Sequence, residues 1–135
     1  MKALIIAMLL LWGFPAMASE LLDIINQERV KRKLPTLVEK SQLTCAATIH
    51  SKDIGARKTC SHQGATGTNP GQRIASCGLK PLAWGEIVAC GQKTPRAAVT
   101  AWINSPGHNA IMFSKTYRYF GGYMYNNYWT VVFTK

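Results

Sequence analysis

The sequence has few acidic side chains. Its 135 residues include six Asp and Glu against sixteen Lys and Arg, which gives a formal net charge of +10. After Asp53 the chain carries a single carboxylate, Glu86. A glycosidase needs two carboxylates around one bond, so the C-terminal part of the chain is poorly supplied for that reaction. Because no basic motif interleaved with aromatics is present, nucleic acid is a poor match. This positive charge would suit an anionic partner such as an envelope component, a lipid or a polysaccharide. We favour the simpler interpretation that the basic residues form a solvated surface.

Long apolar runs are absent beyond the N-terminus. The one such run, residues 3–14, follows Lys2 and precedes Ala16-Met17-Ala18, a small-residue pattern typical of a signal-peptide cleavage site. We therefore predict a signal peptide over residues 1–18 and a single domain over residues 19–135. Lys2 is the only charged residue that cleavage near Ala18 would remove, so the formal net charge falls from +10 to +9. The mature protein is expected to be secreted or periplasmic, with no transmembrane segment.

The four cysteines include no C-x-x-C pair, which argues against a zinc site made of thiolates. An even number of cysteines in an exported chain predicts disulfides. A helix expected over residues 41–57 would separate Cys45 from Cys60 by roughly 20 Å, whereas a disulfide needs Cα atoms within about 7 Å. Two outcomes are left. Either Cys45 pairs with Cys77 or Cys90 and Cys60 pairs with the other, or Cys77 pairs with Cys90 alone.

Apolar periodicity and capping residues predict helices first and an antiparallel hairpin last. Helices are expected over residues 20–32, capped by Ser19, and over 41–57 and 95–104, with a helical turn near 72–76 and a short helix starting at Ser105-Pro106. A short buried extended segment is expected directly after Glu86. Residues 118–125 and 128–134 are rich in aromatic and β-branched side chains, and Asn126-Asn127 between them suits a two-residue turn. This order predicts an α+β fold.

Three separate segments supply two imidazoles and one carboxylate: Ser61-His62, Gly85-Glu86-Ile87 and Trp102 to His108. Two neutral imidazoles and a carboxylate would leave one open position on a zinc ion, the pattern of a catalytic site. Zinc or another divalent cation there could acidify a bound water. No H-E-x-x-H helix supports this interpretation. The alternative is a hydrogen-bonded polar cleft in which Glu86 orients one histidine.

Other polar and aromatic residues have simpler structural interpretations. His50 lies on the apolar stripe of the helix over residues 41–57 and is expected to be a core histidine. Trp102 and Trp129 are expected in the core, while Trp84 could equally line a cleft. A Ser–His–acid hydrolase would use Ser61 or Ser105 as nucleophile, but Ser105 is better explained as a helix cap. Asp53, on the same helix as His50, is the other carboxylate that could approach the site.

These residues resemble a known family. The matching motifs are Asn26-Gln-Glu-Arg29 with Leu34-Pro35, His50-Ser-x-Asp53, Ser61-His62, Arg73-Ile74, Gly85-Glu86-Ile87, Trp102-x-Asn-Ser-Pro-Gly-His108 and Tyr128-Trp129-Thr130. In this order they are similar to the CAP superfamily (cysteine-rich secretory, antigen 5 and pathogenesis-related proteins), most of all to its small bacterial SCP-like secreted branch.

The resemblance implies an α-β-α sandwich of the CAP type with a small antiparallel sheet. It also implies a central cleft lined by two histidines and two acids, which holds a divalent metal in some members. His62, His108 and Glu86 match that set, whereas the second acid has no counterpart. We therefore expect an exported binding protein with a His/Glu cleft for an anionic or lipidic partner, with a divalent metal such as zinc as candidate cofactor. The alternative is a zinc-dependent hydrolase that uses His62, Glu86 and His108.

Overall fold

The computed structural model describes residues 16–135. Most of the predicted signal peptide therefore lies outside the described residues, and its cleavage stays a prediction. The elements are, in chain order, α1 (Ala16–Lys31), β1 (Val38–Glu39), α2 (Ser41–Arg57), α3 (Pro70–Ser76), β2 (Trp84–Cys90), α4 (Pro95–Ile103), α5 (Pro106–Met112), β3 (Tyr119–Tyr125) and β4 (Tyr128–Thr134).

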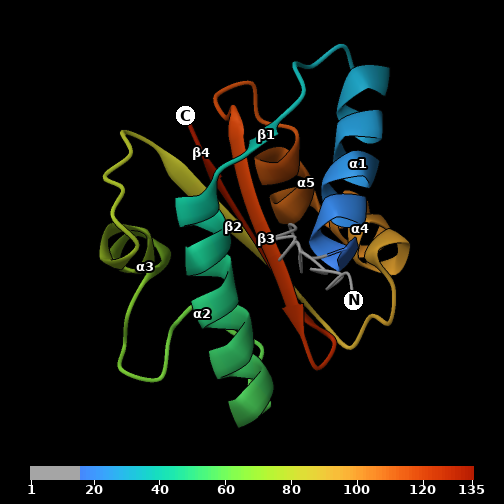
Figure 1. Cartoon of the computed structure of the whole chain (residues 1–135). Coiled ribbons are helices and arrows are strands. Elements are labelled where there is room, and N and C mark those ends of the chain that lie inside the picture. The colour runs from blue at the N-terminus through green and yellow to red at the C-terminus, as the bar shows by residue number, and fades with distance from the viewer. Residues whose placement is uncertain (1–15) are drawn as a thin grey trace, which may run out of the picture.

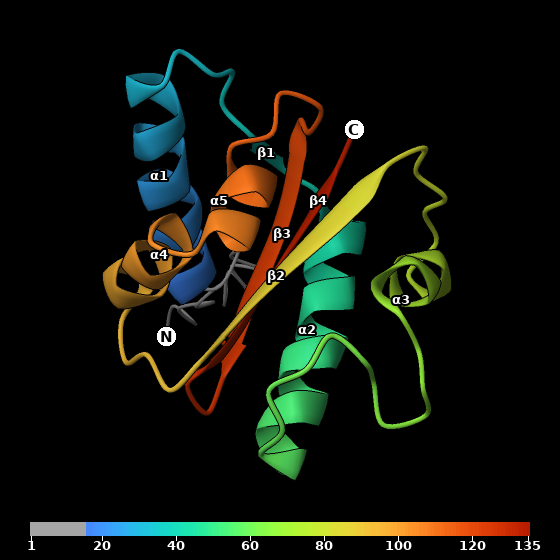
Figure 2. The ribbon, with the colours of Figure 1, turned by 180° about the vertical axis from the view of Figure 1, so that it is seen from behind.

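The strands form one sheet between two helical layers. Its order is β1-β3-β4-β2, with β1 parallel to β3 and the other pairs antiparallel. Helices α1, α4 and α5 cover one face, and α2 and α3 cover the other (Figure 1). This arrangement confirms the predicted α+β sandwich. Strand β2 is therefore an edge strand of the sheet, and it lies at the front in Figure 2.

Alternation along β4 explains how one strand serves both layers. Trp129, Val131 and Phe133 are fully buried in the larger core cluster together with residues of α1 and α4. Val132 points the other way, into the smaller cluster beneath α2. Successive side chains of a strand face opposite sides of the sheet, so an almost continuous apolar run fills both cores.

The hairpin between β3 and β4 forms as predicted. Asn126 and Asn127 both adopt positive φ angles, 52° and 64°, as a type I′ turn requires. Asparagine tolerates this region better than most residues. The turn fixes the register that pairs Tyr125 with Tyr128 and, further along, Tyr119 with Thr134.

Two details differ from the sequence-based prediction. Helix α1 already includes Ala16, the first described residue, so Ser19 lies inside the helix and does not cap it. The apolar face of α1 extends to Ala18, which is buried, and this packing favours the longer helix. The two-residue strand β1 was not predicted, because so short a strand carries no periodicity that could be detected.

The disulfides are Cys45–Cys77 and Cys60–Cys90, with Cα atoms 6.0 and 6.1 Å apart. This is one of the pairings that the sequence left open. The first ties α2 to the end of α3, and the second ties the loop after α2 to the end of β2. Two disulfides fit an exported protein. Among the described residues, no helix is both long and apolar enough to cross a membrane.

Candidate functional site

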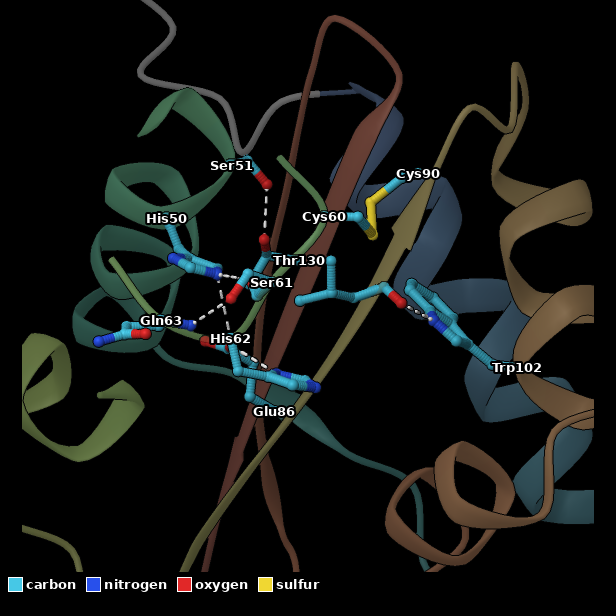
Figure 3. Close-up of a disulfide and its surroundings, with 11 residues drawn as sticks. His50, Ser51, Cys60, Ser61, His62, Gln63, Glu86, Cys90, Trp102 and Thr130 are labelled. Atoms are coloured by element: carbon cyan, nitrogen blue, oxygen red, sulfur yellow. Dashed lines mark hydrogen bonds and ion pairs between the residues drawn. A yellow bond between two sulfur atoms is a disulfide. The ribbon is translucent and has the colours of Figure 1, made fainter. Parts of the chain in front are cut away.

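Glu86 is the centre of the candidate site. Its side chain extends from β2 toward the α2–α3 layer and is 1% exposed. Oε1 accepts a hydrogen bond from His62 Nδ1 at 2.9 Å, and Oε2 accepts one from Arg73 Nη2 at 2.8 Å. Figure 3 shows Glu86 with the neighbouring imidazoles. The carboxylate therefore has a partner on each oxygen and is neutralised inside the protein.

Arg73 is the functional residue that the sequence analysis missed as a member of the site. It is 3% exposed and donates to Glu86, to the main-chain oxygen of His62 at 2.9 Å and to that of Thr68 at 2.8 Å. Helix α3 holds it in place through an Asn69–Gln72 capping box. Its only signal in the sequence was the Arg73-Ile74 match within the family pattern.

His50 contributes to the same network from α2. Its ring is fully buried, and Nε2 donates to the main-chain oxygen of Ser61 at 2.6 Å, because a carbonyl can only accept. Nε2 also lies 3.6 Å from Glu86 Oε1, whereas Nδ1 has no partner among the described residues. The expected core position is found, but His50 also supports the loop that carries His62.

Burial lowers the pKa of His50 below its ordinary value of 6.5, against the opposing effect of Glu86, with Arg73 adding to the decrease and Asp53 opposing it. The unfolded chain then binds more protons than the folded chain at mildly acidic pH. We therefore expect the free energy of unfolding to fall as the pH drops through 6.5, and His50→Gln to flatten that dependence. Urea unfolding between pH 5 and 8 measures it. His108→Gln is the control and should flatten it less, because His108 is less buried. A His50→Gln profile parallel to that of the unmodified protein would contradict the prediction.

His62 turns one edge of its ring to solvent. Because Nδ1 donates to Glu86, the neutral ring carries its lone pair on Nε2. The side chain is 53% exposed. A carboxylate that fixes the tautomer and orientation of a histidine in this way is a common outer partner of metal-binding or ligand-binding imidazoles.

A cavity of about 340 Å³ opens beside His62. Its lining residues are His62, Pro70, Trp84, Gly85, Glu86, Ile111 and Tyr117. A Cβ on Gly85 would come within 2.8 Å of Tyr117 Oη and 3.0 Å of Ile111 Cγ2, so both side chains pack directly against the main chain of Gly85. Trp84, left undecided by the sequence, lines the cavity and is 41% exposed.

Two further cavities adjoin the first. One of about 300 Å³ shares His62 and Pro70 with it and adds Gln63 and Thr68. The other, of about 390 Å³, shares Trp84 and brings in Leu79, Pro81 and Lys80. We refer to the three cavities together as the cleft. Its lining includes the imidazole of His62, the indole of Trp84 and the side chain of Lys80.

His108 lies in the first turn of α5, as predicted. Its pKa is lowered by burial and further by the positive charge that His62 can carry. The structure brings His62 into contact with Glu86.

The predicted metal site can be compared with these contacts. The two imidazoles are suitable donors, because lone pairs of neutral histidines are good ligands for divalent ions. Glu86 is better suited to hydrogen-bond a metal-binding histidine than to bind the metal itself, because Arg73 and His62 already occupy its two oxygens. Within residues 16–135, no group of three His, Cys, Asp or Glu side chains is arranged to hold a metal ion. The three-residue ligand set therefore stays a prediction.

Two other candidate catalytic groups, Ser61 and Asp53, are engaged in contacts of their own. The Ser61 hydroxyl accepts a hydrogen bond from Gln63 N, and Asp53 pairs with Arg57 at 2.7 Å. Ser105 precedes α5 without a capping bond from its side chain. Neither serine donates to an imidazole in the described part of the chain, so these contacts do not form a Ser–His nucleophile.

Comparison with known proteins gives the class to which this fold and cleft belong. The family model described as "CAP: Cysteine-rich secretory protein family" matches residues 22–134. The chain belongs to this family. The match includes every residue of the Glu86 network, and it confirms the resemblance seen in the sequence.

Individual relatives are bacterial. Over 120 residues the chain is 32% identical to YkwD of Bacillus subtilis, and the match covers 87% of this chain and 47% of YkwD, so it spans about half of that relative. The fold matches an extracellular SCP-domain protein from Bacillus anthracis with a TM-score of 0.84, at 26% identity over 87% of this chain and 40% of that one. An outer surface protein of Borrelia burgdorferi matches with a TM-score of 0.79, at 29% identity over 87% of this chain and 90% of that one.

Proposed function

We propose that this protein is an exported binding module whose cleft takes up an anionic partner at the cell envelope or outside the cell. Export is supported by the two disulfides and by similar structures described as extracellular and outer-surface proteins. The observation that carries the proposal is that Arg73 already neutralises the one carboxylate of the cleft, Glu86.

The charge that the cleft presents to a ligand follows from this pairing. With Glu86 turned inward, the cleft offers His62 and Lys80 beside the rings of Trp84 and Tyr117. The chain as a whole carries sixteen Lys and Arg against six Asp and Glu. The resulting positive field would raise the local concentration of anions and speed their encounter with the cleft. The aromatic walls would then bind an apolar or planar part of the same partner.

Binding by the cleft can be separated from simple charge attraction. We would titrate the ¹⁵N-labelled protein with oligoglutamate, alginate oligomers and phosphatidylglycerol vesicles at about 50 and 300 mM salt, which differ strongly in screening. At least one anionic probe should shift the Trp84 indole resonance at both salt concentrations. The three probes distinguish an acidic peptide, a polysaccharide and a lipid as the source of the anion.

Matched variants locate the binding. His62→Ala and Lys80→Ala should each weaken it about threefold to tenfold, the effect of one lost polar contact of about 0.7–1.4 kcal/mol. Lys93→Ala is the control, because Lys93 follows the opposite end of β2 and lines none of the three cavities. Equal losses in Lys80→Ala and Lys93→Ala, or binding that disappears at high salt, would reduce the interaction to general charge attraction.

A second candidate is a divalent ion held by His62 and His108 with Glu86 as the outer partner of His62. The arrangement that favours it is the Nδ1 bond to Glu86, which leaves Nε2 free for a ligand. A zinc ion there would acidify a bound water, the chemistry of the hydrolase alternative. Zinc analysis of the purified protein tests it. Substoichiometric zinc that is unchanged in His62→Ala and His108→Ala would exclude this site, and turnover insensitive to chelators would exclude the hydrolase.

A further inference from the structure

The outer edge of β2 has main-chain groups that the sheet does not use. In an antiparallel pair, alternate residues direct N–H and C=O toward the partner strand, and the others direct them away. Lys135 N donates to Ala83 O, and Gly91 N donates to Asn127 O. Both bonds have the register of the β2–β4 ladder. The odd-numbered residues of β2 therefore bond to β4, and the even-numbered residues face outward.

Two side chains close most of this edge. Tyr117 Oη donates to the main-chain oxygen of Trp84 at 2.9 Å, and Trp102 Nε1 donates to that of Val88 at 3.0 Å. Both acceptors belong to even-numbered residues, which agrees with the ladder. Glu86 lies between them. Among residues 16–135, its main-chain N–H and C=O have no hydrogen-bond partner.

This gap in the edge lies at the cleft. Glu86 lines the cavity of about 340 Å³, with Tyr117 and Ile111 on one side and His62 and Pro70 on the other. Figure 2 shows β2 at the front, between α5 and α3. An unpaired N–H and C=O in a concave site are strong, directional groups, and an extended main chain satisfies both at once. The main-chain oxygens of Trp84 and Val88 already accept hydrogen bonds from side chains. Full pairing is therefore restricted to one residue of a partner strand, the one opposite Glu86.

We propose that the cleft binds an extended peptide, one residue of which forms an antiparallel pair with the main chain of Glu86. The proposal rests on the proposed function, because the peptide is the anionic partner and occupies the same cleft. The paired residue directs its side chain to the face of the sheet that carries the Glu86 side chain and His62. Its two neighbours point to the opposite face, toward Tyr117 and Ile111. The cleft therefore favours apolar residues on either side of the paired residue.

Selective N-methylation of a peptide tests the pairing without changing any side chain. The probe is acetyl-Thr-Val-Glu-Val-Thr amide, added at up to millimolar concentration to the full ¹⁵N-labelled chain. N-methylation of its Glu removes the N–H that would donate to the main-chain oxygen of Glu86. N-methylation of the following Val alters an amide that faces away. The first change should weaken binding about tenfold, and the second less than about threefold, because one hydrogen bond of about 1.4 kcal/mol is at stake.

Tyr117→Phe provides a test in the opposite direction. It frees the main-chain oxygen of Trp84 and lengthens the open edge, so the peptide should bind about threefold to tenfold more tightly. If Tyr117 only shaped the cavity, the same variant would weaken binding or leave it unchanged. The amide resonance of Glu86 should shift on addition of the peptide, and its hydrogen exchange should slow.

The outcomes separate this inference from the function on which it rests. Equal losses for the two methylated peptides, or no shift of the Glu86 amide at millimolar peptide, would overturn strand pairing. If alginate or phosphatidylglycerol still bound at Trp84 in that case, the proposed anion-binding role of the cleft would stand and only the peptide would be excluded. If none of these probes perturbed the cleft, both proposals would fall.

Discussion

Arg73→Ala is expected to lower the free energy of unfolding by about 3–5 kcal/mol, the usual effect of removing one partner from a buried ion pair. The Glu86 side chain is 1% exposed and would lose the guanidinium 2.8 Å from Oε2. Arg73 also holds the main-chain oxygens of His62 and Thr68, so the loop over the cleft would loosen as well. Urea unfolding followed by circular dichroism measures the change.

The exposed pair between Asp53 and Arg57 is the matched control. Its side chains are 23% and 35% exposed, and such pairs contribute about 0–1 kcal/mol. Arg57→Ala should therefore change stability little. The double variant Arg73→Met with Glu86→Leu should recover much of the loss, because it leaves no unpaired buried charge. Equal effects of Arg73→Ala and Arg57→Ala would show that burial of the Glu86 pair does not determine stability.

Gly121→Ala is expected to destabilise the fold by about 3 kcal/mol or more, at the upper end for overpacked cores. Helix α2 crosses β3 at Gly121 so closely that an added Cβ would collide with the main chain of Leu43 and Thr44. Main-chain atoms within a helix cannot swing aside as a side chain can. Relief therefore requires α2 to move away from the sheet. Thermal or denaturant unfolding measures the loss.

Gly107→Ala is the control for that substitution. Gly107 lies in α5, where a Cβ meets no atom within 4 Å. Alanine there should be neutral or stabilising by up to about 1 kcal/mol, because glycine is the weaker helix former. A Gly121→Ala variant as stable as Gly107→Ala would contradict the close approach of α2 to β3.

The elements that the sequence predicted well have causes within a few residues. The hairpin follows from two asparagines that tolerate positive φ between β-branched and aromatic runs. Helix α4 begins where Thr94 and Pro95 indicate, with Thr94 Oγ1 accepting from Ala97 N. The predicted cap at Ser19 was wrong, because Ala18 is already helical and its side chain is buried.

The candidate site was predicted in part. The motifs located His62, Glu86 and His108, and the structure joins the first two by a hydrogen bond. Arg73 escaped notice because an arginine in a basic chain has no feature that marks it as buried. Its role depends on α3 packing against β2, which brings residues 13 apart in sequence to 2.8 Å.

By itself the sequence determined the class of fold and the exclusion of a Cys45–Cys60 bridge. These follow from periodicity, from capping and from the length of one helix, all of which are local. Only the tertiary structure decided which cysteines pair, that Arg73 neutralises Glu86, and that the main-chain groups of Glu86 lie unpaired between two capped oxygens. These features depend on distances between segments far apart along the chain, and such distances are set by how the two helical layers pack on the sheet.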